Sequence, residues 1–521
     1  MDAGGLVIAP GFIDVHTHYD AQIFWDPALS PTSLHGVTTV VAGHCGFSIA
    51  PVDATHADYM MRLLSRVEEI PLQSLQSGVP WGAWSTFAEY LACLDGRCAI
   101  NVGFMVGHSA LRRMAMGEAA VGRKADAAQL DRMQALLRES LAGGALGFSS
   151  SHGKLDLDHH GDPVPSRWAD EEELCALAGV LREFPGTTLE WLPVENRAGD
   201  EPGRLTKLAQ AAGRPVIWNL FFMTAGGADQ EARDLNVSDE AARLGGRVVA
   251  TFIPIPMKIV LSFGVGSILE AQPGWDAVRF SLPHAERLRA FADPDVRRRL
   301  REGAAKRIMG PEFDDFANYT LSETFAAANA GLAGRRVGEI AAERGRDPFD
   351  TWLDIVVADD LRTLFFPPVL GADADSWARR ARLWGDPRTI VGGSDAGAHL
   401  TMLDTFGLFS DFVGCSVRDR RSIGLEQAVQ LVTSVPAAFL GLHDRGRIAP
   451  GCRADLALFD PGTLRPGPVG MVRDLPGGAP RLYGAAEGMQ RVIVAGTEIV
   501  RDGAYTGALP GRILRGGIDT R

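Results

Sequence analysis

Residues 11–18 read Gly-Phe-Ile-Asp-Val-His-Thr-His, a short apolar run that ends in two histidines. The run predicts a buried β-strand, and His16 and His18 follow it at positions i and i+2. Residues two apart on an extended chain point to the same side. Neutral imidazoles are the commonest metal ligands, so the pair indicates half of a metal site. The alternative, two surface histidines in a loop, fits less well because the pair directly follows a buried strand.

Outward from this stretch, short apolar, β-branched runs alternate with helical patterns such as Ala125–Leu141. Eight strands are expected, at Leu6–Val15, Val37–Ala42, Ile100–Val106, Ala145–Ser149, Thr187–Trp191, Pro215–Asn219, Arg247–Phe252 and Thr389–Gly393. Continuous apolar strands separated by helices are typical of a parallel sheet covered on both faces. Eight such units predict a closed (β/α)₈ barrel, whose active site lies at the carboxyl ends of the strands.

The chain divides into a large and a small part. Residues 9–444 are expected to form the barrel, and residues 263–361 a helical insertion, with a basic helix at Arg287–Arg307, that acts as a lid. Residues 445–521 change character, with strand-like runs at Ala454–Phe459 and Val492–Val500, the latter folded at Ala495–Gly496. Residues 1–8 are interpreted as the remnant of an N-terminal segment of the same β unit. The predicted fold class is therefore α/β, a TIM-like barrel with a small β-sandwich domain formed by the chain ends.

Composition narrows the class of protein. The 521 residues are 46% apolar and 22% charged, which is ordinary for a globular protein with a large core. A net charge of −12 argues against a nucleic-acid partner, because phosphate binding needs a basic face. Six cysteines without a Cys-x-x-Cys pair suggest reduced thiols and a cytoplasmic location. No apolar run approaches the length of about 18 residues that spans a membrane, so no membrane partner is expected.

A cysteine follows the second predicted strand, in the segment Gly43-His44-Cys45-Gly46. A thiolate there can ligate or bridge metal ions, since metal binding lowers the pKa of a thiol. A lone cysteine is more often a small buried apolar residue. The flanking glycines and the position at a strand end favour Cys45 as a metal ligand.

An aspartate follows the last predicted strand, in the segment 392–397, Gly-Gly-Ser-Asp-Ala-Gly. In a closed barrel the last strand lies beside the first, so Asp395 is expected to face His16 and His18. A carboxylate at that place can ligate the metal and act as general base toward a water molecule. The alternative is a helix-cap or turn aspartate. His399, four residues on, either supports the site or is a buried structural histidine.

Together these motifs resemble the amidohydrolase superfamily, and within it the N-acyl-D-amino-acid deacylase branch. The resemblance covers nearly the whole chain from Val7 onward and is carried by residues 9–20, 36–52, 107–113, 147–153, 392–397 and 444–461. It implies metal ligation by His16, His18 and Cys45, with Asp395 as ligand and general base. It also implies hydrolysis of an amide by metal-activated water, with zinc the usual ion.

The chain departs from that branch in several places. Where the branch carries histidines after the fifth and sixth strands, this chain reads Thr-Leu-Glu-Trp at 188–191 and Ile-Trp-Asn-Leu at 217–220. Glu190 and Asn219 are the nearest polar substitutes, and Glu190 is interpreted either as a ligand or as a paired interior carboxylate. The branch more often has asparagine in place of His44, and its substrate-binding arginine has no evident counterpart in 395–406. Members of the branch usually carry further strands before the segment that begins at residue 2, and these strands complete the small β unit. We therefore expect either a misplaced start codon or a sheet edge that is buried against a partner.

The leading hypothesis is a hydrolase with one or two zinc ions that cleaves an amide C–N bond in a small molecule such as an N-acylated amino acid. Trp218, Asn219 and His399 are the candidate substrate-binding residues. One alternative is a lactone or ester hydrolase for a bulky or aromatic metabolite, suggested by tryptophans at the strand ends. Another is a binding protein that has lost catalysis, suggested by the missing histidines. The sequence leaves the oligomeric state undetermined, and a homo-oligomer is one alternative.

Overall fold

The computed structural model describes residues 3–194, 201–264, 268–307 and 310–521. Eight parallel strands form the main sheet, in the order β2 (Phe12–Asp14), β3 (Val37–Ala42), β4 (Asn101–Gly107), β5 (Gly147–Ser151), β6 (Thr188–Leu192), β7 (Val216–Phe221), β8 (Val248–Phe252) and β11 (Thr389–Val391). Each strand except β11 follows its neighbour in the sequence, and β11 lies beside β8. The predicted TIM-like barrel is thus confirmed.

The barrel closes through the residues that follow its first and last strands. Thr17 and Ala396 form a parallel bridge between them. The carboxylate of Asp14 accepts hydrogen bonds from the backbone N–H groups of Gly393 and Ser394, at 3.2 and 3.3 Å. The segment that carries His16 and His18 therefore lies beside the segment that carries Asp395.

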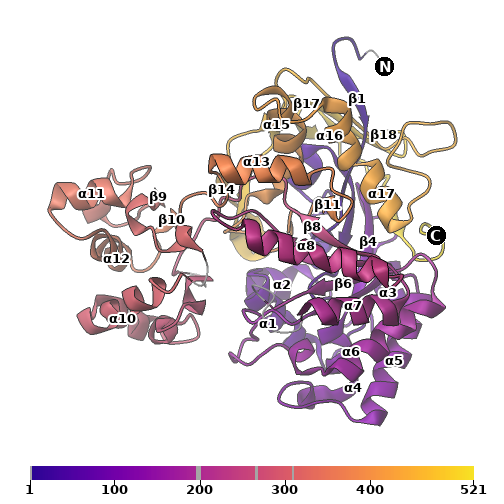
Figure 1. Cartoon of the computed structure of the whole chain (residues 1–521), viewed down its shortest axis with the longest axis horizontal. Coiled ribbons are helices and arrows are strands. Elements are labelled where there is room, and N and C mark those ends of the chain that lie inside the picture. Colours follow the sequence, from indigo (N-terminus) through magenta and orange to yellow (C-terminus); the bar gives the residue numbers. More distant parts are fainter. Residues whose placement is uncertain (1–2, 195–200, 265–267, 308–309) are drawn as a thin grey trace.

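Helices cover the outside of the sheet (Figure 1). They include α3 (Phe87–Leu94), α4 (His108–Met116), α5 (Ala127–Ala142), α6 (Glu171–Val180), α7 (Glu201–Ala212) and α8 (Ala228–Arg243). The predicted helix at Ala125–Leu141 corresponds to α5, which begins at a capping box formed by Asp126 and Gln129. The barrel interior is filled by Ile13, Val15, Val41, Met105, Leu146, Ile217, Val249 and Ile390. Among the described residues, no helix has the length and apolar character needed to cross a bilayer.

The first predicted strand, Leu6–Val15, is wrong as a single element. The chain instead forms β1 (Val7–Pro10), which pairs antiparallel with β12 (Leu456–Phe459), and then β2, which opens the barrel. Gly11 separates the two strands, and a Cβ atom at that position would lie 2.1 Å from Oγ1 of Thr38. Glycine is needed here because the chain passes so close to β3 as it changes sheet.

Both chain ends contribute to the small β unit, as predicted. Its five-stranded sheet has the order β1, β12, β17 (Met489–Val494), β18 (Thr497–Arg501) and β19 (Ala504–Tyr505). The predicted fold at Ala495–Gly496 is the turn of the hairpin between β17 and β18. Two short pairs accompany this sheet, β14 (Gly470–Leu475) with β15 (Ala479–Tyr483) and β13 (Arg465–Pro466) with β16 (Ala486–Glu487). The last strand, β20 (Ile513–Leu514), returns to pair with β4 of the barrel.

The segment expected to be an insertion forms a lobe at the side of the barrel (Figure 1). Its elements are α9 (His284–Ala292), α10 (Pro294–Ala304), β9 (Thr320–Glu323), α11 (Val337–Arg344) and α12 (Pro348–Ala358), and β9 pairs with β10 (Leu364–Phe366). The continuous helix predicted at Arg287–Arg307 is wrong, because Asp293 caps a new helix whose first residue is Pro294. The lid role of this lobe stays a prediction.

The connection between β3 and β4 contains α1 (Ala57–Val67) and α2 (Leu72–Gly78). After the lateral lobe come α13 (Ala374–Leu383), α16 (Leu425–Leu431) and α17 (Ser434–Leu440). The connection after β3 matters most for function, because Glu68, directly after α1, contacts His18 at the end of the first barrel strand.

Candidate active site

Three polar side chains meet where the first and last barrel strands end. The Nε2 atoms of His16 and His18 lie 3.2 Å apart. Oδ1 of Asp395 lies 3.2 Å from the first of these atoms and 3.1 Å from the second. Tetrahedral zinc, with Zn–N distances of about 2.0–2.1 Å, places two of its donor atoms about 3.3 Å apart. The triangle of donors therefore has the dimensions of a shared metal site.

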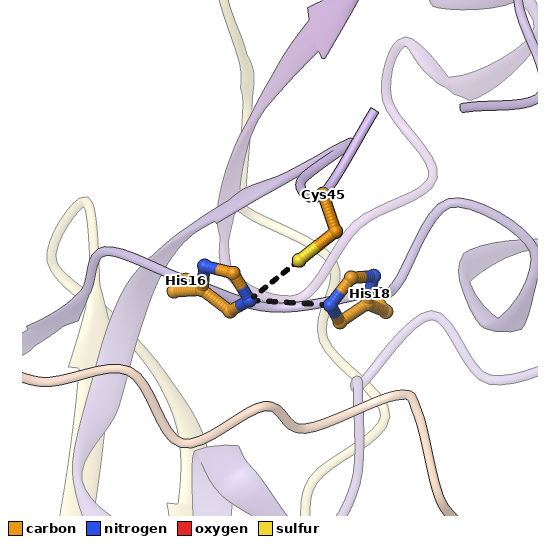
Figure 2. Close-up of side chains that lie close together, drawn as sticks. All are labelled: His16, His18 and Cys45. Atoms are coloured by element: carbon orange, nitrogen blue, oxygen red, sulfur yellow. Dashed lines mark hydrogen bonds between the residues drawn. The ribbon is translucent and has the colours of Figure 1, made fainter. Parts of the chain in front are cut away.

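Cys45 reaches the same cluster from the loop after β3 (Figure 2). Its Sγ atom lies 3.7 Å from Nε2 of His16. The backbone of Cys45 is left-handed, with φ 55°, a strained conformation typical of functional sites. Gly43 is also left-handed, at φ 82°, and a Cβ there would lie 2.4 Å from the carbonyl oxygen of Met105. The glycine allows the loop to lie against β4 and to direct the thiol toward His16.

Electrostatics favour a cation in the cluster. Burial lowers the pKa of His18, so its imidazole is neutral, the form that binds metal. Burial raises the pKa of the Asp395 carboxyl, but the contacts with His16 and His18 outweigh this and hold it well below its usual range. Burial, and then the charge of Glu190, raise the pKa of the Cys45 thiol well above its usual range. A bound metal ion would stabilise both the carboxylate and the thiolate.

Glu68 is a member of the site that the sequence analysis missed. Its Oε1 atom lies 3.2 Å from Nδ1 of His18, and both side chains are 4% exposed. Metal-binding histidines commonly place their second ring nitrogen against a carboxylate, which fixes the tautomer and the orientation of the ring. Glu68 lies in a connection directly after α1, where a glutamate has no distinctive sequence signal.

His399 lies near the second carboxylate oxygen of Asp395, the one that does not face His16 and His18. Its Nε2 atom lies 3.9 Å from Oδ2 of Asp395, and its Nδ1 atom lies 3.5 Å from Oε2 of Glu69. Burial lowers the pKa of His399, but Glu69 and Asp395 outweigh it and raise the pKa to about 10. His399, a candidate substrate-binding residue, thus lies between two carboxylates that favour its protonated form.

The residues at the ends of β6 and β7 form a second polar group inside the barrel. Oε2 of Glu190 accepts a hydrogen bond from the backbone N–H of Cys45 at 2.9 Å, and its other oxygen accepts one from Asn219. Oδ1 of Asn219 accepts a hydrogen bond from the Thr251 hydroxyl at 2.6 Å. Asn219 therefore orients Glu190 and is itself held in place by β8.

Trp218 does not join this group. It is fully buried in the apolar layer between the strands and the surrounding helices, where it contacts Phe221. Side chains alternate along a strand, so Trp218 and Asn219 point to opposite faces of β7. Its predicted contact with substrate stays a prediction, and Trp218 lies on the face of the strand away from the donor cluster.

Asp14, which the sequence analysis missed, forms hydrogen bonds that hold the donor cluster in place. Asp14, fully buried at the end of β2, accepts hydrogen bonds from the hydroxyl and backbone N–H of Ser394 and from the backbone N–H of His16. The position of Asp14, two residues before His16, could have indicated a role in the site. Its apolar neighbours instead led to its interpretation as part of a strand. Asp14 holds the two segments that carry the histidines and Asp395 in register.

A barrel with histidine, cysteine and carboxylate donors at the carboxyl ends of its strands defines this chain as a metal-dependent hydrolase of the TIM-barrel class. Comparison with known proteins agrees. The sequence model of the amidohydrolase family matches residues 1–496. The chain belongs to this family, and within it to the D-aminoacylase-like branch. The predicted resemblance and the predicted reaction class, metal-dependent hydrolysis of an amide bond, are confirmed.

Three relatives illustrate the match. An uncharacterised protein of Mycobacterium tuberculosis is 29% identical over 506 residues, covering 89% of this chain and 78% of that protein. D-aminoacylase of Alcaligenes xylosoxydans xylosoxydans is 27% identical over 528 residues, covering 99% of this chain and 88% of that protein. A crystal structure of D-aminoacylase superposes with a TM-score of 0.62 at 25% identity, covering 99% of this chain and 90% of the other.

Proposed function

We propose that this chain is a zinc-dependent amidohydrolase that cleaves the amide bond of N-acylated D-amino acids. The observation that carries the proposal is the triangle formed by His16, His18 and Asp395, with sides of 3.1–3.2 Å. The substrate class is supported by the similarity to D-aminoacylase and to an N-acyl-D-glutamate deacylase, which is 27% identical over 521 residues. A metal centre is also the subject of one solved D-aminoacylase structure, at 25% identity.

The side chains of the site divide the work. His16, His18 and Asp395 would hold the zinc ion, with Cys45 close enough to join them. When bound, the ion polarises the substrate carbonyl and lowers the pKa of a water molecule. Asp395 is ionised at neutral pH, because its contacts with the two histidines lower its pKa. It is therefore able to accept a proton from the attacking water.

The proton then leaves with the amine. Attack of water on the carbonyl carbon forms the new C–O bond, and the C–N bond breaks to give a carboxylic acid and an amine. Asp395 transfers the proton it received to the departing nitrogen, which restores the carboxylate. His399 lies beside Asp395 as a cation, in a position to attract the carboxylate of an amino-acid substrate.

The test combines metal analysis with a substrate panel. We expect wild-type protein loaded with zinc to hydrolyse N-acyl-D-amino acids in preference to their L enantiomers. The double variant His16→Ala/His18→Ala should lose both bound zinc and hydrolysis. Absence of hydrolysis of every N-acyl amino acid by fully zinc-loaded wild-type protein would overturn the proposal.

A further inference from the structure

Ser149 is a fully buried residue of β5 that the mechanism above does not use. It lies in residues 147–153, one of the segments on which the family resemblance rests. Its hydroxyl donates a hydrogen bond to the carbonyl oxygen of Gly43 at 2.5 Å. The same oxygen accepts a hydrogen bond from the backbone N–H of Gly46 at 3.1 Å. One side chain thus joins the two ends of the short segment that contains Cys45.

The backbone of this segment, residues 43–46, is unusual. Gly43, Cys45 and Gly46 all have left-handed φ values, of 82°, 55° and 75°. Glycine adopts this region without strain, but a residue with a side chain does not. A strained residue of this kind keeps its conformation only where the surrounding structure holds it. The hydrogen bonds of Ser149 span all three left-handed residues, so they are placed to hold this conformation.

Other contacts fix the loop at single points. The backbone N–H of Cys45 donates a hydrogen bond to Oε2 of Glu190 at 2.9 Å. The carbonyl oxygen of Gly46 accepts one from the backbone N–H of Ser109 at 3.0 Å. A Cβ atom at Gly46 would lie 3.2 Å from the Cα atom of Ser150, so the loop packs directly on β5. Each of these contacts holds one point of the loop, whereas the bridging hydroxyl holds two.

The conformation of the loop sets the position of the Cys45 thiol. Its Sγ atom lies 3.7 Å from Nε2 of His16. A cysteine side chain has one torsion angle to its sulfur atom, with three staggered positions. Rotation of this side chain therefore does not compensate for a change in the backbone at Cys45. A backbone that left the left-handed region would move the sulfur atom away from His16.

We propose that Ser149 is a positioning residue that holds the Cys45 thiol in place to bind the metal ion. It acts through the backbone of the loop and is not itself a donor. Protein ligands of metal ions are commonly oriented by hydrogen bonds from neighbouring groups. The proposal deepens the proposed function and rests on it, because it takes Cys45 as a ligand of the ion at His16 and His18.

The experiment replaces zinc by cobalt in the whole protein, because cobalt bound to a thiolate has a strong charge-transfer band in the near ultraviolet. The wild type should show this band, and Cys45→Ala should lose it. Ser149→Ala should lose most of the band and bind zinc about tenfold to a hundredfold more weakly, the usual effect of removing a group that orients a ligand. Ser149→Thr keeps the hydroxyl and should restore both the band and the affinity.

Ser150 provides a matched control on the same strand. It is also buried, but its hydroxyl lies 2.8 Å from Nδ1 of His108 and does not bond to the loop. Ser150→Ala also removes a buried hydroxyl from β5, but it should keep the cobalt band and the zinc affinity of the wild type. Ser149→Val has the volume of threonine without the hydroxyl and should behave like Ser149→Ala. Circular dichroism establishes whether each variant is folded.

Several results would overturn the positioning role of Ser149. One is an unchanged band and zinc affinity in Ser149→Ala and Ser149→Val, and another is an equal loss in Ser150→Ala. Failure of both hydroxyl-free variants to fold would make Ser149 a residue of the core alone. Absence of the band from the wild type, or its retention in Cys45→Ala, would remove Cys45 as a ligand and the proposal with it.

Hydrolysis of N-acyl-D-amino acids by the zinc-loaded proteins separates this proposal from the proposed function. Hydrolysis by a wild type whose cobalt form lacks the band would overturn the role of Ser149 and leave the function standing. A band that depends on Ser149, in a wild type that hydrolyses no N-acyl amino acid, would do the reverse. A wild type that binds neither zinc nor cobalt would overturn both.

Discussion

Asp14, at the end of the first barrel strand, accepts hydrogen bonds from both the hydroxyl and the backbone N–H of Ser394, which follows the last strand. The two residues are 380 positions apart in the sequence. This contact joins the segment that carries the HxH histidines to the segment that carries Asp395. The geometry of the donor cluster therefore depends on one buried carboxylate that is not itself one of the donors.

Replacement of Asp14 tests this dependence. Asp14→Ala leaves several buried donors unsatisfied and should lower the free energy of unfolding by about 3 kcal/mol. Asp14→Asn keeps an acceptor for the backbone N–H groups and should cost less than about 1 kcal/mol. Denaturant unfolding of the metal-free proteins measures both. Equal losses in the two variants would contradict the role of the hydrogen bonds.

Glu68 and Glu69 offer a matched pair of neighbours. Glu68→Gln removes the carboxylate that orients His18 and should weaken zinc binding about tenfold, the lower end of the effect of such partners. Glu69→Gln changes the same charge but faces His399, so its zinc affinity should stay close to that of the wild type. Competition with a chelator measures both affinities. Similar losses in both variants would indicate a general effect of charge.

Asp395→Asn removes the proposed base while keeping the shape of the side chain. We expect kcat for amide hydrolysis to fall by a factor of about 10²–10⁴, the contribution typical of a general base. Asp375→Asn, at an exposed aspartate of α13, serves as the control with unchanged turnover. Bound zinc is measured in each sample, so that loss of metal is distinguished from loss of the base. Near wild-type kcat in Asp395→Asn would exclude this residue as the base.

Gly43→Ala tests the loop that carries Cys45. The new Cβ would lie 2.4 Å from the Met105 carbonyl oxygen, on a backbone with φ 82°. Gly82 has a similar φ of 88° but no atom within 4 Å of such a Cβ. Gly82→Ala should therefore cost only the conformational penalty, about 1–2 kcal/mol, and Gly43→Ala clearly more, with reduced zinc content. Equal unfolding free energies would show that the loop shifts without strain.

His35 predicts a pH dependence of stability away from the metal cluster. It is buried, with Nδ1 2.7 Å from the Ser410 hydroxyl and Nε2 3.0 Å from the Gly484 carbonyl oxygen. Burial lowers its pKa from 6.5 to about 4, so between these values the unfolded chain binds a proton that the folded chain does not. Its contribution is therefore complete above pH 6.5 and decreases as the pH falls to 4, by about 3 kcal/mol.

The comparison of His35→Gln with wild type isolates this effect. Unfolding free energies measured at pH 7.5 and at about pH 4.5 should fall less steeply in the variant. His284→Gln, at a half-exposed position, should keep the wild-type slope. An unchanged slope in His35→Gln would show that other groups account for the loss of stability in acid.

The barrel and the chemistry at the ends of its strands could be predicted from the sequence. Apolar strand patterns and helical patterns are local, so seven of the eight barrel strands are found close to their predicted places, and the first lies inside the longer run predicted at Leu6–Val15. Strand order follows from chain order in a parallel barrel, which is why the sequence predicts Asp395 beside His16 and His18. The pair His16 and His18 and the loop that carries Cys45 are likewise predicted from residues that are neighbours in the sequence.

Features that depend on contacts between distant parts of the chain could not be predicted in this way. Both faces of a barrel strand are buried, so apolar pattern alone does not show that Asn219 points inward and Trp218 outward. Glu68 reaches His18 from a connecting segment, and no local signal marks a residue that acts through such a distant contact. The partner of Gly11 is set by how β1 and β2 pack on β3, and that of Asp14 by how β2 packs beside β11. Both ring nitrogens of His44 are buried only in the folded core, where burial removes the water that would hydrate them in an unfolded chain.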